Sequence, residues 1–493
     1  MFWLFYFGKG QKTMYDVTII GCGIAGASLA YQLSQYDLRV LVLERENDVS
    51  MGTTKANSAI VHAGYDPEYG TLMAKLNVRG AEMMEPLCRA LSVEYRRTGS
   101  FVIALNETDL PHLQKLYKNG VKNGVPGLRL LSGEEARAME PHLADTVCGA
   151  LLAPSAGIVD PWGLCIAEAE VAVRNGVELR LRSEVRGVED HGGRYVVHTS
   201  SGDVETAYLV NCSGTHGHEI SAMVGPREWD AHPSRGEYYL LDKSSGGLVQ
   251  HVIFQCPTVR GKGVLVSPTV HGNLIVGPNA QDADDADDRK TTLSGLDEVA
   301  DSSRRSVPCL DLRQSIRNFA GVRAVTSESD FILRPSASSP RLLHICGIKS
   351  PGLTAAPAIA EYALELLGGM GLTLCRKSSW DGGRERICFR KLSETEKAEL
   401  IRRDPRYGRV ICRCETITEG EIVAAIHSPI PPCSIDGIKR RAGAGMGRCQ
   451  GGFCGPRVLE LLARELGSNP MQIPQDGDGT RLLIEETKGG DRK

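Results

Sequence analysis

No apolar stretch of this sequence approaches the roughly 20 residues that a membrane-spanning helix needs. The formal net charge is −3, so the chain also lacks the basic surplus typical of proteins that bind nucleic acid. A secretory signal is missing too, because the apolar start MFWLFYF has no basic residue before it and no small-residue cleavage site after it. We therefore expect a cytoplasmic protein without a transmembrane segment, in which residues 1–13 form a leader of unknown role.

Signals for a disulfide framework are missing as well. The fifteen cysteines are odd in number and spread along 493 residues, a length that does not depend on disulfides for stability. Since no secretory signal precedes them, we expect reduced thiols, most of which pack as small apolar side chains. A chain of this length favours two or three domains.

Residues 16–46 carry a dinucleotide-binding pattern, DVTIIGCGIAGASLAYQLSQYDLRVLVLERE. We expect short strands at 17–20 and 39–43 and a helix at 27–34, joined by a glycine-rich turn. Strand, turn, helix and second strand in this order are far more specific than the glycine spacing alone. The pattern predicts a Rossmann-type fold that binds FAD or NAD.

The three glycines and one acid of this pattern have separate tasks. Gly21 makes the tight turn, Gly23 lets the backbone approach a pyrophosphate, and Gly26 packs the helix on the strand. The helix N-terminus offers N–H groups to the phosphates. Glu44, 23 residues after Gly21, is placed to bond the ribose hydroxyls. No second complete pattern exists, because AGAGMG (442–447) lacks the strand and the acid, so one dinucleotide site is expected.

Three later stretches resemble the FAD-dependent amino-acid and hydroxy-acid oxidoreductases. They are TTKANSAIVHAGYDP (53–67), AYLVNCSGTHGHEI (207–220) and HICGIKSPGLTAAPAIAEYALELL (344–367). Within that family, RGEYYLL (235–241), SPTVHGNLIVGPNA (267–280) and FAGVRA (319–324) resemble the anaerobic-type glycerol-3-phosphate dehydrogenases and the L-2-hydroxyglutarate oxidases. The resemblance covers about residues 14–370 and implies FAD as the cofactor. It also implies cofactor contacts at Thr53, Ser58, Val185, Gly214, Gly347, Gly352, Leu353 and Thr354.

The same resemblance implies a small set of substrate and catalytic groups. Arg323 would hold an anionic group of the substrate, as a guanidinium fork suits carboxylate or phosphate. Lys349 would lie beside the flavin, and Arg235 and Tyr238 would form the floor of the substrate cavity. His62 is the candidate base, because hydride transfer from a secondary alcohol needs a group that takes the hydroxyl proton. The stretch HAGYDPEYG lacks an arginine that the glycerol-phosphate group commonly carries there, which leaves the substrate open.

Two close cysteine pairs lie near the C-terminus. Cys412 and Cys414 are followed, after 34 intervening residues, by Cys449 and Cys454 within the glycine-rich stretch GMGRCQGGFCG. These spacings fit a zinc site poorly, and the Cys-x-x-Cys of thioredoxin-like chemistry is absent from the four. A four-thiolate iron–sulfur cluster tolerates varied spacing, provided that glycines let backbone N–H groups turn toward the sulfur atoms. Zinc remains the alternative.

The surrounding residues resemble a known small module. ICRCETITEGEIVAAI and IDGIKRRAGAGMGRCQGGFCGPRV are similar to the bacterioferritin-associated-ferredoxin-like 2Fe-2S domain. The resemblance implies that Cys412, Cys414, Cys449 and Cys454 hold a 2Fe-2S cluster within a helical domain at 406–465. Residues 371–405 would then be a linker and 466–493 a C-terminal tail. Ser393 and Glu396 have the spacing of a capping box, which predicts a short helix inside that linker.

We therefore expect an α/β protein in which a Rossmann-type FAD domain is interleaved with an antiparallel-sheet substrate domain, followed by the small 2Fe-2S domain. The FAD part would comprise about residues 14–75, 145–230 and 325–370, and the substrate part about 76–144 and 231–324. The expected activity is oxidation of a small anionic secondary alcohol, most simply glycerol 3-phosphate, with electrons passing to an acceptor protein or redox subunit. The alternatives are oxidation of L-2-hydroxyglutarate or an amino acid or opine, and a role as an electron-transfer subunit of a larger complex.

Overall fold

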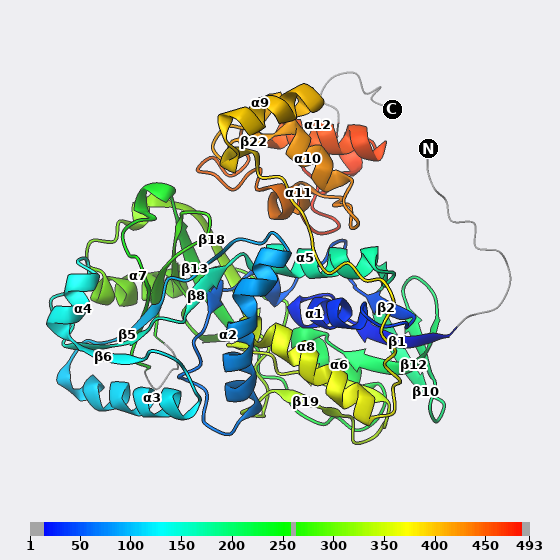
Figure 1. Ribbon diagram of the computed structural model, residues 1–493, viewed down its shortest axis with the longest axis horizontal. Helices are drawn as coiled ribbons and strands as arrows, with labels where there is room; N and C mark the ends of the chain where they lie inside the picture. Colours follow the sequence, from blue (N-terminus) through cyan, green and yellow to red (C-terminus); the bar gives the residue numbers. More distant parts are fainter. Residues whose placement is uncertain (1–13, 258–262, 486–493) are drawn as a thin grey trace.

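The protein consists of two sheet-based parts and a small helical module (Figure 1). The computed structural model describes residues 14–257 and 263–485, so the leader at 1–13 lies outside the described residues. In the described ranges, no helix combines the length and the apolar character that crossing a bilayer requires.

The first sheet has eight strands and a parallel centre. Its order is β10 (Val185–Asp190), β11 (Tyr195–Thr199), β12 (Val204–Asn211), β1 (Tyr15–Ile20), β2 (Val40–Leu43) and β9 (Glu178–Arg180), while β20 (Leu342–Cys346) pairs with β12 and β19 (Ile332–Pro335) pairs with β20. β1 runs parallel to both β2 and β12, and β12 runs parallel to β20. The strands and helix expected at 17–43 are thus present, with α1 (Ile24–Leu33) between β1 and β2.

A layer of helices packs on this sheet and buries the main core. It contains α1, α2 (Leu72–Ala90), α5 (Pro161–Arg174) and α8 (Gly352–Gly369), whose apolar side chains join those of the central strands. α2 and α8 approach so closely that a Cβ on Gly80 would lie 2.1 Å from the carbonyl oxygen of Thr354. The small helix α6 (Gly217–Ala222) follows β12, and a second apolar cluster covers the other face of the sheet.

The second sheet has nine strands and carries the expected substrate part. Its order is β17 (Gln281–Asp282), β13 (Ser234–Leu241), β16 (Leu274–Gly277), β15 (Leu265–Pro268), β14 (Val252–Gln255), β5 (Ser100–Ala104), β7 (Gly149–Ala153) and β6 (Arg129–Ser132), with β18 (Ser315–Arg323) paired to β13. All pairs are antiparallel except β14 with β5. Around it lie α3 (Leu110–Lys122), α4 (Gly133–Met139) and α7 (Leu293–Ser306). β7 pairs with β5 and β6, so residues 149–153 lie in this sheet and not with the flavin part, where the sequence grouping placed them.

A three-stranded sheet connects the two parts. It consists of β3 (Ile60–Val61), β8 (Gly157–Val159) and β4 (Tyr95–Arg96). β3 belongs to the stretch expected beneath the flavin, and β8 follows directly after β7 of the second sheet. The stretch is therefore anchored from both sides.

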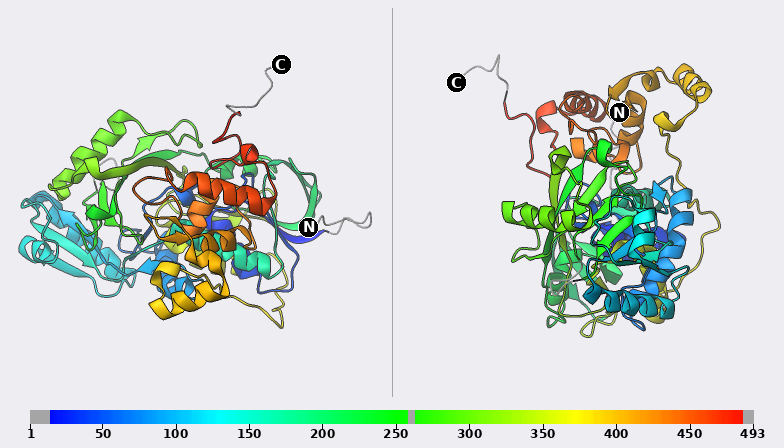
Figure 2. Two further views of the ribbon diagram at one scale, coloured as in Figure 1. Left: turned by 90° about the horizontal axis from the view of Figure 1, so that it is seen from above. Right: turned by 90° about the vertical axis from the view of Figure 1, so that its left-hand side faces the viewer.

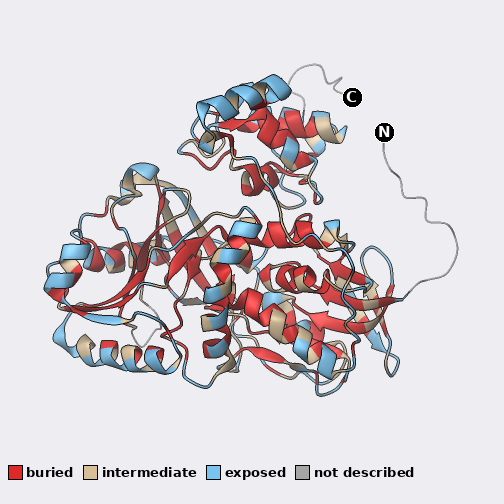
Figure 3. Cartoon of the chain, in the orientation of Figure 1, coloured by how far each residue is buried: buried red, intermediate tan, exposed pale blue. Residues whose placement is uncertain are grey.

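The helical module lies over α5 at the top of the molecule (Figures 1 and 2). It contains α9 (Glu394–Arg403), β21 (Val410–Cys412), β22 (Ile417–Thr418), α10 (Glu419–Ile426), α11 (Ile435–Ala442) and α12 (Gly455–Leu466). The module has its own buried core, seen in red inside it in Figure 3. The capping box predicted for the linker is confirmed, since the Ser393 side chain accepts from the Glu396 N–H and the Glu396 carboxylate accepts from the Ser393 N–H.

The segment after α12 is more than a loose tail. Asp476 forms ion pairs with Arg440 of α11 at 2.6 Å and with Lys55 of the flavin part at 2.7 Å. Asp478 accepts two hydrogen bonds from Arg182, which follows β9. The described part of the segment expected as a tail therefore fastens the module to the first part.

Candidate functional site

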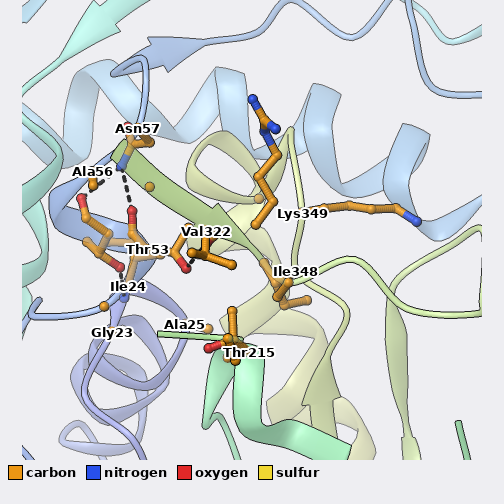
Figure 4. A pocket seen from close by; sticks show the side chains of 18 of the residues that line it. Gly23, Ile24, Ala25, Thr53, Ala56, Asn57, Thr215, Val322, Ile348 and Lys349 are labelled. Atoms are coloured by element: carbon orange, nitrogen blue, oxygen red, sulfur yellow. Dashed lines mark hydrogen bonds between the residues drawn. The ribbon is translucent and has the colours of Figure 1, made fainter. Parts of the chain in front are cut away.

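A cavity of about 610 Å³ runs between the first part and the second sheet (Figure 4). Its walls come from the glycine turn after β1, the stretch 52–62, the end of β18 and the turn before α8. Thirteen of the residues expected from the sequence line it: Gly21, Gly23, Glu44, Thr53, Ser58, His62, Val185, Gly214, Tyr238, Arg323, Lys349, Gly352 and Leu353. Gly26, Arg235, Gly347 and Thr354 do not.

The glycine turn is shaped as the sequence pattern requires. Gly21 has a φ of +97°, and a Cβ there would lie 2.6 Å from the carbonyl oxygen of Cys212. A Cβ on Gly26 would lie 2.0 Å from the carbonyl oxygen of Gly21, so helix and turn are in contact. A Cβ on Gly23 would meet only the Thr54 hydroxyl, at 3.3 Å. Gly21 and Gly26 are therefore needed by the fold, whereas the small size of Gly23 leaves room for a ligand.

The start of α1 points its N–H groups toward the same space. Gly23 is the N-cap residue and offers no side chain, and the Ile24 N–H donates to the Thr54 hydroxyl at 3.0 Å. Figure 4 shows Gly23 and Ile24 at this helix end, beside Thr53. The unpaired N–H groups and the positive dipole end form an anion site suited to a pyrophosphate.

Glu44 is held rigidly at the end of β2. One carboxylate oxygen accepts from the Cys22 N–H at 2.8 Å and the other from the Glu46 N–H at 3.0 Å. Burial raises the pKa of Glu44. Val185 and Gly214 line the same end of the cavity, Gly214 with a φ of +62°. This end offers a buried carboxylate and an apolar wall, which suits a ribose and an adenine ring.

The opposite end is closed by the turn before α8. Gly352 and Leu353, the first residues of that helix, line the cavity. Thr354 instead lies beneath the wall, where its hydroxyl accepts from the His62 N–H at 2.9 Å. Gly347, with a φ of +63°, shapes the turn itself. The last two therefore support the site from outside the cavity.

Two contacts join the first part to the second sheet across the cavity wall. The Thr53 hydroxyl donates to the Val322 carbonyl of β18 at 2.7 Å, as Figure 4 shows. The Ser58 hydroxyl lies 3.4 Å from the phenol oxygen of Tyr238 on β13. Tyr238 in turn stacks on Phe319 with ring centroids 4.7 Å apart. The cavity therefore depends on both sheets for its shape.

Arg323 ends β18 with its guanidinium in the cavity wall. Nη1 donates to the Ser234 hydroxyl at 3.2 Å and Nη2 to the Asn279 carbonyl at 2.9 Å. Both partners are neutral, and the described residues supply no carboxylate in an ion pair with Arg323. Its positive charge is thus oriented but not neutralised, as an anion-binding arginine requires.

Lys349 and His62 lie at the end closed by α8. Lys349 donates to the Glu328 carbonyl at 3.0 Å, and burial lowers its pKa. The His62 Nε2 lies 3.2 Å from the Ser350 hydroxyl, and its ring stacks on Phe254 at a centroid distance of 5.7 Å. A cation and an imidazole therefore share the region where the flavin ring is expected.

Arg235 lies elsewhere, against the expectation that it forms the cavity floor with Tyr238. The two residues are three positions apart on β13, and an odd spacing places side chains on opposite faces of a strand. Arg235 pairs with Asp288 and lies 3.4 Å from Glu237, which shares its face of the strand. Its guanidinium is thus already occupied by two carboxylates.

Sequence reasoning missed several residues of the cavity wall. Thr54 receives the first N–H of α1, Asn279 holds Arg323 through its carbonyl, Ser350 contacts His62, and Phe254 stacks on it. Ser350 lies in the KSPG turn that the resemblance had already singled out. Phe254 lies on β14 and Asn279 in the connection between β16 and β17, and no local pattern in the sequence connects them to the site.

The four C-terminal cysteines come together as two close pairs. The Sγ atoms of Cys414 and Cys449 are 3.9 Å apart. The thiols of Cys412 and Cys454 are hydrogen-bonded, which lowers the pKa of Cys412 to about 6 and raises the pKa of Cys454. All fifteen cysteines are free thiols, and Cys433 stands apart from the four, with its thiol donating to the Asn47 carbonyl.

The loops around these thiols supply the geometry that a cluster needs. N–H groups of Gly451 and Phe453 donate to Cys449, and those of Gly445 and Glu415 donate to Cys412. Such N–H groups stabilise thiolate sulfur. The chain also comes close to itself here, because a Cβ on Gly447 would lie 2.2 Å from the Cβ of Cys414.

This donor set fits a binuclear cluster better than a single ion. Across the ranges 14–257 and 263–485, no three His, Cys, Asp or Glu side chains gather closely enough to hold one metal ion. A structural zinc needs four ligands around one centre, whereas a 2Fe-2S cluster takes two thiolates on each of two irons. The two thiol pairs match the second arrangement. The long cavity, with an anion site between an acidic end and a cationic end, likewise fits FAD.

Two family models match the chain. One, described as FAD dependent oxidoreductase, matches residues 16–366, and the other, described as BFD-like [2Fe-2S] binding domain, matches residues 410–464. The first match covers both sheets and the cavity, and the second covers the cysteine module.

A curated relative spans nearly the whole chain. The glycerol 3-phosphate dehydrogenase of Caloramator mitchellensis is 48% identical over 96% of this chain and 99% of that protein. The glycerol 3-phosphate oxidase of Mycoplasma genitalium is 30% identical over 74% of this chain and 97% of that protein. Among solved structures, the dithionite-reduced L-alpha-glycerophosphate oxidase of Mycoplasma pneumoniae, with FAD bound, has a TM-score of 0.73 and 28% identity, covering 76% of this chain and 99% of that chain.

Proposed function

The chain belongs to the FAD dependent oxidoreductase family, and from this premise we propose that it is a dehydrogenase that oxidises glycerol 3-phosphate to dihydroxyacetone phosphate. The observation that carries the proposal is the match, end to end, with a glycerol 3-phosphate dehydrogenase at 48% identity. The cavity supplies the groups that such a reaction needs, and the C-terminal module supplies a route for the electrons.

Arg323 and Lys349 are the proposed partners of the phosphate. A phosphate dianion gains most from a guanidinium that is already oriented and has no competing carboxylate, and Arg323 meets both conditions. Lys349 adds a second cation at the same wall of the cavity. Holding the anionic end of the substrate in this way orients the secondary alcohol for reaction.

His62 is the proposed base for the hydroxyl proton. As the alcohol carbon loses a hydride, its hydroxyl loses a proton to the imidazole, and a ketone forms. The stacking of His62 on Phe254 and the contact of Nε2 with Ser350 fix the ring at the cavity wall. The backbone of His62 is fixed as well, through its hydrogen bond to Thr354.

The two cofactors divide the electron chemistry. Bound FAD would accept the hydride, and a 2Fe-2S cluster on the four cysteines would carry the electrons onward one at a time. The N-terminus of α8 and Lys349 both line the cavity, and we propose that they stabilise negative charge at the flavin.

The extent of the relatives supports a dehydrogenase over an oxidase. The Mycoplasma genitalium oxidase leaves about a quarter of this chain without a counterpart, whereas the Caloramator relative extends over 96% of it. A protein that passes both electrons to oxygen has no need of a one-electron carrier. We propose that the additional module delivers electrons to a separate acceptor protein or redox subunit, in a reducing compartment such as the cytoplasm.

Anaerobic reduction of the purified protein tests this proposal. Glycerol 3-phosphate should bleach the flavin absorption band, whereas L-2-hydroxyglutarate, glycine and proline at equal concentration should not. An electron paramagnetic resonance spectrum of a reduced 2Fe-2S cluster should follow the bleaching. If only L-2-hydroxyglutarate bleaches the flavin, the protein is an L-2-hydroxyglutarate oxidoreductase and not a glycerol 3-phosphate dehydrogenase. If only a reduced partner protein bleaches the flavin, the enzyme assignment is wrong.

A further inference from the structure

An exposed aromatic side chain projects from the loop that carries two of the thiols. Phe453 lies between Cys449 and Cys454, and 86% of its surface is accessible. Its own N–H donates to the Cys449 sulfur, so the ring is attached directly to the cysteine site. A single exposed apolar side chain is common on protein surfaces, so the position of Phe453 beside the thiols gains meaning only from the charges around those thiols.

Two arginines are sequence neighbours of the same thiols. Arg413 lies between Cys412 and Cys414, and Arg448 directly precedes Cys449, whose sulfur lies 3.9 Å from that of Cys414. Both arginines are exposed. Arg448 forms an ion pair with Asp242 at 3.4 Å, whereas no ion pair joins Arg413 to a carboxylate of the described residues.

Acidic side chains are nearly missing from the two chain segments that carry the thiols. Residues 443–457 contain no Asp or Glu, and the only one in 409–416 is Glu415. Glu415 is buried and already pairs with Lys243 at 2.6 Å and Arg390 at 3.0 Å. The cysteine face, defined as Arg413, Cys414, Arg448, Cys449 and Phe453, is therefore a cationic surface around one apolar contact point.

We propose that the cysteine face is the docking site of a small acidic one-electron carrier protein. The inference deepens the proposed function, on which it rests, by placing the exit of the electrons. Arginine and aromatic side chains dominate contact energies at interfaces, and opposite charge speeds the encounter of two proteins. Cys414 is exposed and Cys449 half-buried, so the proposed cluster ligands are adjacent to the docked carrier. Each encounter transfers one electron: the module is oxidised by one and the carrier reduced by one, so two carriers leave per substrate.

Two haem proteins of opposite charge test the site in the intact holoenzyme. The soluble haem domain of cytochrome b5 is acidic and cytochrome c is basic, and both take one electron. The enzyme is reduced anaerobically with stoichiometric dithionite, which makes the result independent of the substrate that it oxidises. Binding is measured by titration calorimetry with the oxidised proteins, and transfer by stopped-flow haem absorption.

We expect the acidic carrier to bind and to be reduced faster than the basic one at low salt. Raising the salt to about 0.5 M should slow the acidic carrier at least about tenfold, because charges at the surface are screened. The variants Phe453→Ser and Arg413→Glu should each weaken binding and slow this transfer by about tenfold. Arg402→Glu makes an equal charge change at an exposed residue of α9, and it should change neither the affinity for the acidic carrier nor the transfer rate by more than about twofold.

Three results would overturn the proposal. The first is that cytochrome c, the basic carrier, binds as tightly as the acidic one. The second is that the rate of electron transfer to the acidic carrier does not change with salt concentration. The third is an Arg413→Glu variant that slows both carriers alike, since the arginine would then act on the cluster and not on the encounter. An unaltered paramagnetic spectrum of the reduced cluster in each variant shows that the thiol site is intact.

Discussion

Arg441 holds the carboxylate of Asp48 through two hydrogen bonds, of 2.8 Å from Nη1 and 2.7 Å from Nη2. Both side chains are buried, and Arg440 adds a third contact at 3.1 Å. Asp48 lies just before the stretch that lines the flavin cavity, and the two arginines belong to α11 of the cysteine module. The two redox parts of the molecule are thus joined by buried charge.

The substitution Asp48→Asn should loosen this junction strongly. It removes the carboxylate that both guanidinium groups share, so that Arg441 keeps only Glu170 at 3.9 Å and Arg440 keeps Asp476 at 2.6 Å. Breaking a buried pair costs about 3–5 kcal/mol. Burial raises the pKa of Asp48, but Arg441 and Arg440 outweigh it and hold the pKa below the ordinary value. The stabilisation is therefore present above the pKa of unfolded Asp and is lost as the pH falls through the lowered value. A lower melting temperature and faster proteolysis within 371–405 would report the loss.

Asp478→Asn is the matched control for that experiment. It also breaks a pair between the C-terminal segment and the flavin part, with Arg182, but both side chains are about half exposed. Exposed pairs contribute about 1 kcal/mol or less. Equal effects of the two substitutions would contradict the assignment of the junction to Asp48.

The glycine turn predicts a sharp contrast between two alanine substitutions. Gly26→Ala places a methyl group 2.0 Å from a backbone oxygen, so little folded protein should be recovered. Gly23→Ala meets only a hydroxyl at 3.3 Å and should fold, but its methyl group should enter the space that we propose for the pyrophosphate. We expect FAD affinity to fall at least about tenfold, or about 1.4 kcal/mol, by fluorescence titration with an unchanged circular dichroism spectrum. Full FAD binding by Gly23→Ala would refute the placement of the phosphates.

Glu168 gives the protein a pH-dependent weakness in its core. Its carboxyl is fully buried on α5, where burial raises its pKa to about 8, and it accepts a hydrogen bond from Ser28 at 2.6 Å. Because the folded value lies above the unfolded one, stability is highest below pH 4.5 for this group and falls until the pH passes about 8. Glu168→Gln should remove this dependence.

The measurement compares melting temperatures of the two proteins at pH 6 and pH 9. The wild type should lose up to about 1.4 kcal/mol per pH unit between 6 and 8 from this residue, whereas the variant should not. The variant should therefore be the more stable protein at pH 9. Parallel pH profiles for both would show that Glu168 does not titrate in this range.

Arg323→Gln should weaken substrate binding selectively. Loss of a charge-assisted hydrogen bond costs about 1.5–3 kcal/mol, which raises KM for glycerol 3-phosphate about 10- to 100-fold. Glycerol, which has no phosphate, should be oxidised equally slowly by both proteins, and FAD content should not change. Arg317→Gln, on the exposed part of the same strand, serves as the control. If the variant also oxidises glycerol 10- to 100-fold less well than the wild type, Arg323 acts on the structure of the site and not on the anion.

Local patterns predicted much of this molecule. The turn at 21–26 and the capping box of Ser393 depend on neighbours within a few residues, and Glu44 belongs to the same continuous motif as its partner Cys22. The structure has all three as expected. The interleaving of the two sheets came from resemblance and not from periodicity, because pairing partners such as β5 and β14 are far apart in the sequence.

The errors have equally physical causes. The resemblance implies a cavity floor that contains both Arg235 and Tyr238, but side chains alternate between the faces of a strand, and residues three positions apart face opposite ways. The role of the segment around Asp476 was missed because its partners, Lys55 and Arg440, lie in two different parts of the fold. Such charges are indistinguishable from solvated surface residues until the tertiary structure brings them together.

Cys454→Ser and Cys433→Ser separate the cluster from the rest of the module. Cys454 is hydrogen-bonded to Cys412 and should be a cluster ligand, so its replacement should remove iron and acid-labile sulfide together with the paramagnetic signal. Cys433 lies in the same module but contacts Asn47 and Arg182, so Cys433→Ser should keep the full metal content.

Glycerol 3-phosphate should still bleach the flavin of Cys454→Ser at close to the normal rate, because the two sites are built from separate elements. Turnover with a one-electron acceptor should fall by more than about tenfold, since the route from the flavin is then interrupted. Normal turnover without iron would mean that the electrons leave directly from the flavin, and zinc in place of iron would make the module a structural domain.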